Sequence, residues 1–354
     1  MSEQITDPWV RLTKDLKQAS TMLGMVEARW LVDTYYSIQK LRVASGNRVE
    51  AAERSREPFA LLGWNFHNLR VLEKDLVVAI TTFSSAYTMG SWLQGICGIG
   101  PVLAANILAT FDIRNCPTAG HWWRFAGLDP TLKWPNKEDR DALIRRVLGT
   151  SSKVEGHHIE ACAGALNRRP ISIMKCHWML QKQRLQRQRQ ALEEEGRDPS
   201  EINMQPPLTT KMQLEKAIAM RPWNARARKT MYLVSDQFVR QRNREKGKFY
   251  GGIYNERKAY EVARNERGEL ADQAARGKTR LADGHIEARV RRYVSKMFLS
   301  HVHARFFEEY YGVEAPMPYP FTDNCKGDHR HFVGRPQHTV PPGRTLRQLY
   351  GEEE

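Results

Sequence analysis

The sequence predicts a mostly α-helical protein in which long amphipathic helices flank a short helical hairpin. Three observations lead to this fold class. Apolar residues recur at helical spacing over long stretches, a glycine-rich turn near residue 98 joins two apolar segments, and alternating strand patterns are scarce. The 354 residues are enough for two or three domains. No apolar run reaches the ~20 residues that a membrane span needs.

Residues 1–90 are expected to form a helical arm. Apolar residues recur near helical spacing from Trp9 to Arg42, and a second stripe steps by three and four from Leu62 to Phe83. The polar stretch Ala44 to Arg56 between them is expected to be a loop or a frayed helix end. Stripes of this kind are typical of packing faces. We therefore expect an antiparallel helix pair or coiled-coil arm, and a homodimer formed through it.

Residues 91–130 carry the most specific pattern, LQGICGIGPVLAANIL from Leu93 to Leu108. This is the pattern of a helix-hairpin-helix clamp, which binds the nucleic-acid backbone. Glycines permit a tight turn and a close approach of backbone amides, and Pro101 suits the first turn of the following helix. The amides and the helix N-terminus would form a positive concavity for a phosphate. The predicted contact residues are Ile96, Gly98, Ile99, Gly100 and Val102. The alternative is a glycine-rich turn between two core helices.

The module closes with TAGHWWRFAGLDP, in which a helix bearing Trp122, Trp123 and Phe125 is expected to end at Gly127. These aromatic residues are expected to lie in the core, because duplex DNA offers no free base faces for stacking.

The rest of the chain is divided into three segments, an insertion at 131–220, a basic helical region at 221–312 and a Pro- and His-rich tail at 313–354. The tail is expected to wrap the surface or to be partly disordered. Helices are predicted at Asp139–Leu148, Ile173–Glu195, Glu256–Ala275 and Ile286–Tyr311, with a turn-rich linker at Gly196–Pro207 and a break at Tyr250–Tyr254. The second helix contains KQRLQRQRQALEEE, for which a solvated helix with i,i+4 pairs is an interpretation at least as good as a nucleic-acid contact.

The charge balance indicates a polyanionic partner. The formal net charge is +15, and basic residues recur in the C-terminal half. The predicted cationic contacts are Arg226, Arg228, Lys229, Arg240, Arg242, Arg291 and Arg292. The five cysteines are odd in number and scattered, which predicts reduced thiols, and the N-terminus has no signal-peptide pattern. A cytoplasmic location is therefore expected.

Several segments resemble the C-terminal helix-hairpin-helix domain of bacterial DEDD-type insertion-sequence transposases. GIGPVLAANILA followed by FAGLDP is similar to that domain's hairpin, WNARARK at 223–229 to a helix start within it, and Phe249-Tyr250-Gly251 with Tyr254-Asn255-Glu256-Arg257-Lys258 to its tyrosine-plus-basic helix. The resemblance covers about residues 60–130 and 221–300. It implies DNA as the ligand, and an RNA ligand as an alternative, since complete members of the family use guide RNA.

The chain departs from this family in its catalytic parts. The N-terminal ribonuclease-H-like domain, whose four acidic residues hold divalent metal, has no counterpart before the hairpin. The family's serine shortly after the Gly-Leu-x-Pro turn is also missing. Ser151 and Ser152 are the first candidates, and a serine needs a neighbouring base or charge to act as a nucleophile.

Metal and cofactor sites are weakly indicated. Cys325, His329 and His331 have the ligand types of a zinc site, as do His301 with His303 and His157 with His158 and Cys162, but none has the paired spacing of a structural site. The carboxylate pairs Asp139 with Asp141 and Glu308 with Glu309 are expected to be solvated charges. No phosphate-binding loop is present, so no cofactor is expected.

The sequence thus predicts a DNA-binding protein related to transposases that grips the phosphate backbone of double-stranded DNA. Three alternatives stay open. These are an active transposase, recombinase or nuclease relative that acts with a partner, a basic assembly protein of a mobile element or phage, and an RNA-binding protein. A membrane partner is not expected.

Overall fold

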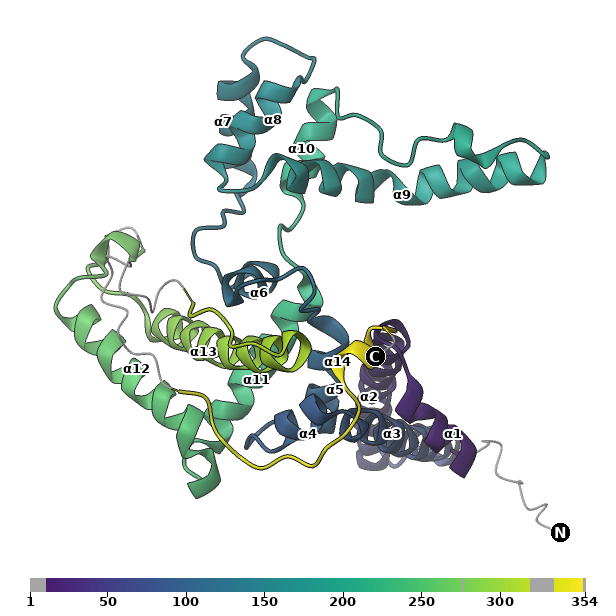
Figure 1. The fold of residues 1–354 in the computed structure, drawn as a ribbon. Helices are drawn as coiled ribbons and strands as arrows, with labels where there is room; N and C mark the ends of the chain where they lie inside the picture. The colour runs from purple at the N-terminus through teal and green to yellow at the C-terminus, as the bar shows by residue number, and fades with distance from the viewer. Residues whose placement is uncertain (1–10, 276, 319–333, 353–354) are drawn as a thin grey trace. The chain divides into compact units, whose positions relative to one another are not determined.

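The computed structural model describes residues 11–275, 277–318 and 334–352. This part of the chain is mostly helical, at 69% helix, and contains no strand (Figure 1). The mostly α fold class is confirmed. Within the same residues, no helix combines the length and the apolar content needed to cross a membrane.

The chain divides into two compact units. Unit 1 comprises residues 1–122 and 229–354, and unit 2 comprises residues 123–228. The helices that lie wholly in unit 1 are α1 (Lys14–Ala19), α2 (Met25–Arg54), α3 (Ala60–Ala86), α4 (Thr88–Gln94), α5 (Pro101–Thr110), α12 (Lys248–Glu266), α13 (Asp283–Tyr311) and α14 (Leu346–Leu349). Those wholly in unit 2 are α7 (Lys137–Leu148), α8 (Gly156–Ala165), α9 (Pro170–Glu194) and α10 (Lys211–Ala219). The two boundaries fall within α6 (Ala119–Phe125) and α11 (Ala225–Gln241).

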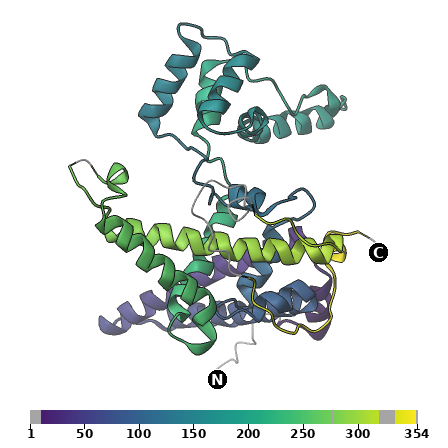
Figure 2. The same ribbon diagram turned by 60° about the vertical axis from the view of Figure 1, so that its left-hand side comes forward.

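Helices α2 and α3 pack as the predicted antiparallel pair (Figure 2). Asn65 reaches Ser45, whereas Glu73, further along α3, pairs with Arg42, which lies earlier in α2. The expectation of a loop at Ala44–Arg56 is wrong, because α2 continues to Arg54. Gly46 faces the ring of Phe66 at close range, so packing against α3 outweighs the weak helix propensity of the Ser-Gly-Asn stretch.

The first predicted helix is interrupted near its start. After α1 and a short 3-10 turn, the chain restarts at Gly24, which is the N-cap of α2 and whose amide donates to Glu27. The restarted helix leaves Trp30 of α2 exposed, and Leu61 of α3 is exposed as well. The homodimer expected from this arm stays a prediction.

The break expected at Tyr250–Tyr254 is wrong, because α12 runs through it from Lys248. Gly251 is buried against Arg242, where a Cβ would lie 2.6 Å from the Arg242 Cα. The glycine therefore serves a close helix contact and does not end the helix. The helix stops at Glu266, nine residues before the expected Ala275, and Ala271–Gln273 forms a 3-10 turn.

Unit 2 has an apolar core of its own. Side chains from α7, α8, α9 and α10 form one buried cluster, in which Ile144, Ile173 and Leu214 are almost fully buried. The predicted helices at Asp139–Leu148 and Ile173–Glu195 are confirmed as α7 and α9, each with slightly different ends. Most of this unit corresponds to the predicted 131–220 insertion.

Residues 334–352 of the tail lie along unit 1. The His338 ring stacks on Trp92 of α4 with an interplanar angle of 7°, and Arg344 donates its amide to the carbonyl of Ala86. The Tyr350 hydroxyl accepts from the amide of Ile113. This part of the tail holds α4 and the segment after α5 in place, as the surface-wrapping expectation anticipated.

Candidate nucleic-acid interface

The turn between α4 and α5 has the backbone geometry that its glycines suggested. Gly98 adopts φ = 96°, a left-handed conformation that non-glycine residues rarely take. Gly100 is the N-cap of α5 at φ = −84°, and Pro101 occupies the first helical turn. The side chains of Ile96 and Ile99 are buried and anchor the turn.

The amides of the turn differ in what they can offer a ligand. Those of Ile96 and Ile99 donate to the carbonyls of Leu93 and Ile96 within the turn. Among the described residues, no backbone hydrogen bond of this turn uses the amide of Gly98 or Gly100. Gly100 is exposed, and a Cβ there would meet nothing within 4 Å. The open side of the turn is therefore at Gly100 and the first turn of α5, including Val102.

Helix α11 closes the other side of the turn. A Cβ on Gly98 would lie 3.2 Å from the Cβ of Gln237 and 3.6 Å from the Cγ of Gln241, so α11 passes close to the turn. A buried hydrogen bond of 2.9 Å from the side-chain amide of Asn106 to the Thr230 hydroxyl joins α5 to the same helix. Gly98 therefore allows α11 and the turn to meet without a side chain between them.

Cations lie on both sides of Gln241 in the sequence. The four exposed cations among them are Arg240, Arg244, Lys246 and Lys248. Arg240 pairs with Asp236, and Lys248 pairs with Glu245. Among the described residues, neither Arg244 nor Lys246 has an ion pair. We name these four residues the corner cations, because they span the tight connection from the end of α11 to the start of α12.

Arg240 is the corner cation that the sequence predicts, whereas Arg244, Lys246 and Lys248 are not among the predicted contacts. Gly247 and Gly251 were the available signal. A Cβ on Gly247 would lie 2.0 Å from the Gln241 carbonyl oxygen, so this glycine permits a sharp reversal of the chain at Gln241, the residue that also lies close to Gly98.

Two of the predicted cations serve structural roles at the start of α11. Arg228, in unit 2, donates to the Gly127 carbonyl and lies over the Trp223 ring. Burial lowers the pKa of its guanidinium. Lys229, the first residue of the second stretch of unit 1, lies 4.5 Å from the centre of the Tyr36 ring. Arg226 is half-buried in unit 2.

The remaining predicted cations lie on different elements of unit 1. Arg242 donates to the Val239 carbonyl, and Arg291 is held between Asp236 and Glu287 at 3.0 and 2.9 Å. Arg292 is exposed on α13. Of the predicted set, Arg240 and Arg242 lie at the corner between α11 and α12, and of these two Arg240 is exposed whereas Arg242 is half-buried.

The predicted serine nucleophiles lie on the surface of unit 2. The Ser151 hydroxyl donates to the Lys153 carbonyl at 2.9 Å, and the Ser152 carbonyl accepts from the Lys211 amide. Within the described part of the chain, no imidazole, amine or carboxylate hydrogen-bonds to either hydroxyl. The hydrogen bonds of these two serines stabilise the loop backbone.

The zinc candidates Cys325, His329 and His331 lie outside the described residues. His303 is buried, and its Nε2 donates to the Cys116 carbonyl at 2.7 Å. His158 caps α8 through the Glu155 amide. In the ranges that the structure describes, no three His, Cys, Asp or Glu side chains gather as a metal would require.

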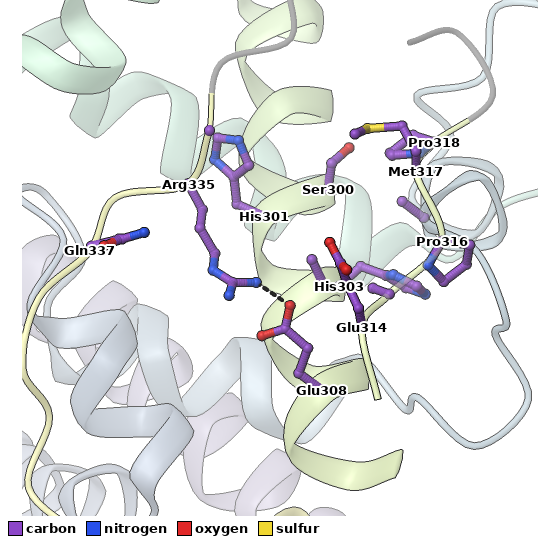
Figure 3. Close-up of a pocket in the computed structure, with 14 residues that line it drawn as sticks. Ser300, His301, His303, Glu308, Glu314, Pro316, Met317, Pro318, Arg335 and Gln337 are labelled. Atoms are coloured by element: carbon purple, nitrogen blue, oxygen red, sulfur yellow. Dashed lines mark hydrogen bonds and ion pairs between the residues drawn. The ribbon is translucent and has the colours of Figure 1, made fainter. Parts of the chain in front are cut away.

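A cavity of about 260 Å³ lies beside α13, under residues 314–318 and 334–337 (Figure 3). An ion pair of 2.5 Å between Arg335 and Glu308 crosses its edge, as the dashed line shows. His301 lines it, with Nδ1 2.9 Å from the Tyr250 hydroxyl. Arg335 and His301 thus already have partners in Glu308 and Tyr250. We do not include this cavity in the candidate interface.

No family model, curated protein or solved structure matches the chain. The function therefore has to be argued from the chain's own geometry.

Proposed function

We propose that the protein binds the phosphate backbone of double-stranded DNA through the α4–α5 turn. The observation that carries this proposal is the combination of an open, glycine-capped helix start with the corner cations on the neighbouring element. Amides at a helix N-terminus bind phosphate through their dipoles, and nearby lysines and arginines extend the contact along the backbone. Contacts of this kind position the nucleic acid and read no base.

The charge of the whole chain supports the same ligand. A net charge of +15 favours a polyanion, and two of the corner cations have no ion pair within the described residues. The resemblance of the hairpin to the transposase domain supports DNA over other polyanions. RNA is the competing ligand, because backbone amides contact the phosphates of either nucleic acid.

The test is a Gly100→Glu substitution, measured by titration of duplex DNA, single-stranded DNA and structured RNA over a series of salt concentrations. The site is open and its φ is ordinary, so a side chain fits there without strain. A carboxylate at the phosphate position repels the ligand. We expect the affinity for duplex DNA to fall about tenfold or more at low salt.

Gly24→Glu is the matched control. Gly24 is also the N-cap of a long helix, with φ = −78° and ψ = 173° against −84° and 175° at Gly100, and it too has open space around it. Both variants change the net charge equally. If the two bind duplex DNA with the same affinity, the turn is not the binding site. A stronger preference for structured RNA in the wild type would identify RNA as the ligand.

A further inference from the structure

The outer half of α9 is a solvated helix of unusual composition. Residues 181–190 read QKQRLQRQRQ, with four cations, five glutamines and no acid. Figure 1 shows this half extending past α7, α8 and α10, with the returning chain along it. All the residues of the window are exposed except Gln181 and Leu185, which are half-buried.

The cations of this window form no direct contact with an acid among the described residues, although the charge of Arg189 acts on Asp198 in the returning chain. Within the described residues, Lys182, Arg184, Arg187 and Arg189 form no ion pair and no side-chain hydrogen bond. Other cations of unit 2 do find partners, such as Arg197 with Glu201 at 3.0 Å. The acids Glu193, Glu194 and Glu195 follow the window and mark its end. A helix with four cations and no acid over ten residues suits a polyanionic partner.

Helix geometry sorts these side chains into three faces. At about 100° per residue, Gln183, Gln186 and Gln190 fall within about 60° of one another. Arg184 and Arg187 lie on one side of this line, and Lys182 and Arg189 lie on the other. The packed face is opposite, because Leu192 is buried there and the half-buried Gln181 and Leu185 share its direction.

The packed face is held by the returning chain. The Trp178 indole donates to the Pro206 carbonyl at 3.1 Å, and the 3-10 turn Pro199–Glu201 contacts α9. The support leaves the glutamine line free. The exposed pair from Gln190 to Glu194, at 3.2 Å, is a weak i,i+4 contact that a ligand can displace.

We infer that α9 enters the major groove of duplex DNA and reads bases with its glutamine line. The major groove is about 12 Å wide and admits one α-helix, and glutamine recognises adenine through two hydrogen bonds. Cations on both sides of the line would meet the phosphates on both sides of the groove. Residues 183–190 span about 10 Å, which corresponds to about three base pairs.

This geometry favours DNA over RNA, because the major groove of an RNA duplex is too deep and narrow for a helix to read. The inference adds base reading to the backbone contact proposed for the α4–α5 turn. It shares with that proposal the expectation of a duplex DNA ligand, and it places the sequence preference on a different element.

The experiment is selection of binding sites from a randomised DNA duplex with the full-length wild type and the variant Gln183→Ala, Gln186→Ala, Gln190→Ala. We expect the wild type to enrich a short, adenine-containing site. A single-base change in that site should lower its affinity about tenfold. The triple variant should lose this preference and keep its affinity for unselected DNA.

The matched control is Gln181→Ala, Gln188→Ala, which removes two glutamines lying toward the packed face. Circular dichroism shows whether each variant keeps its helix content. Retention of the site by this control supports the inference. No enriched site in the wild type, or the same site in the triple variant, overturns it. Tighter binding to an RNA duplex than to DNA overturns it as well.

Gly100→Glu in the same selection separates the two proposals. If the turn does not bind phosphate, this variant keeps the affinity and any site preference of the wild type. Failure of the α9 inference appears instead as no enriched site in the wild type or as the same site in the triple glutamine variant.

Discussion

Gly98 and Gly100 look alike in the sequence but have different structural roles. Gly98 takes a left-handed conformation and lies against Gln237, so its lack of a side chain is needed for packing. Gly100 has an ordinary conformation and open space around it, so it leaves amides accessible. The sequence predicts the turn from the spacing of the two glycines. It cannot predict which glycine faces solvent, because Gln237 is far away along the chain.

His303 makes folding sensitive to acid. Its ring is buried beside the rings of Trp122 and Phe307, and burial lowers its pKa from 6.5 to about 4. Between these values the unfolded chain binds a proton that the folded chain does not. Stability is therefore complete above about pH 6.5 and falls as the pH drops toward 4, by about 3 kcal/mol from this group.

Urea unfolding at pH 7.5 and pH 5 tests this effect. We expect His303→Gln to show a smaller loss of stability at pH 5 than the wild type, since glutamine can still donate to the Cys116 carbonyl. His285→Gln, at an exposed position, should behave like the wild type. Equal pH dependence in the wild type and His303→Gln would contradict the assignment.

Helix α12 shows how a packing contact can place glycine inside a helix. Gly251 lies against the Arg242 backbone, whereas a Cβ on Gly252 would meet nothing within 4 Å. The adjacent glycines Gly251 and Gly252 predicted a break, because glycine has a low helix propensity. The contact with Arg242, just after α11, makes the first glycine necessary, and the helix continues through both.

Alanine substitutions at the two positions should have opposite effects. We expect Gly252→Ala to stabilise the protein by about 0.5–1 kcal/mol through helix propensity. Gly251→Ala should destabilise it by about 2 kcal/mol or more, because the new methyl would overlap the Arg242 backbone. Thermal or urea unfolding measures both. Effects of the same sign would show that α12 and the end of α11 do not meet as described.

Unit 2 is continuous in sequence and has its own core, which predicts independent folding. A fragment of residues 123–228 should be helical by circular dichroism and should unfold cooperatively. Ile173→Ala, at a fully buried position, should lower the fragment's stability by about 2–4 kcal/mol. A fragment that unfolds without a cooperative transition would show that unit 2 needs the rest of the chain.

The mostly helical fold, the antiparallel arm, the α4–α5 turn and the core positions of Trp122 and Trp123 follow from the sequence, because helix periodicity and glycine spacing are local properties. Long-range packing decided the rest. It extended α2 through Gly46 against Phe66, and it carried α12 through its glycine pair. It also decided the roles of the basic residues, because Arg228 and Arg291 support the fold whereas Arg244 and Lys246 are exposed between α11 and α12. Charge is visible in a sequence, but whether a cation is available depends on partners that only folding brings near it.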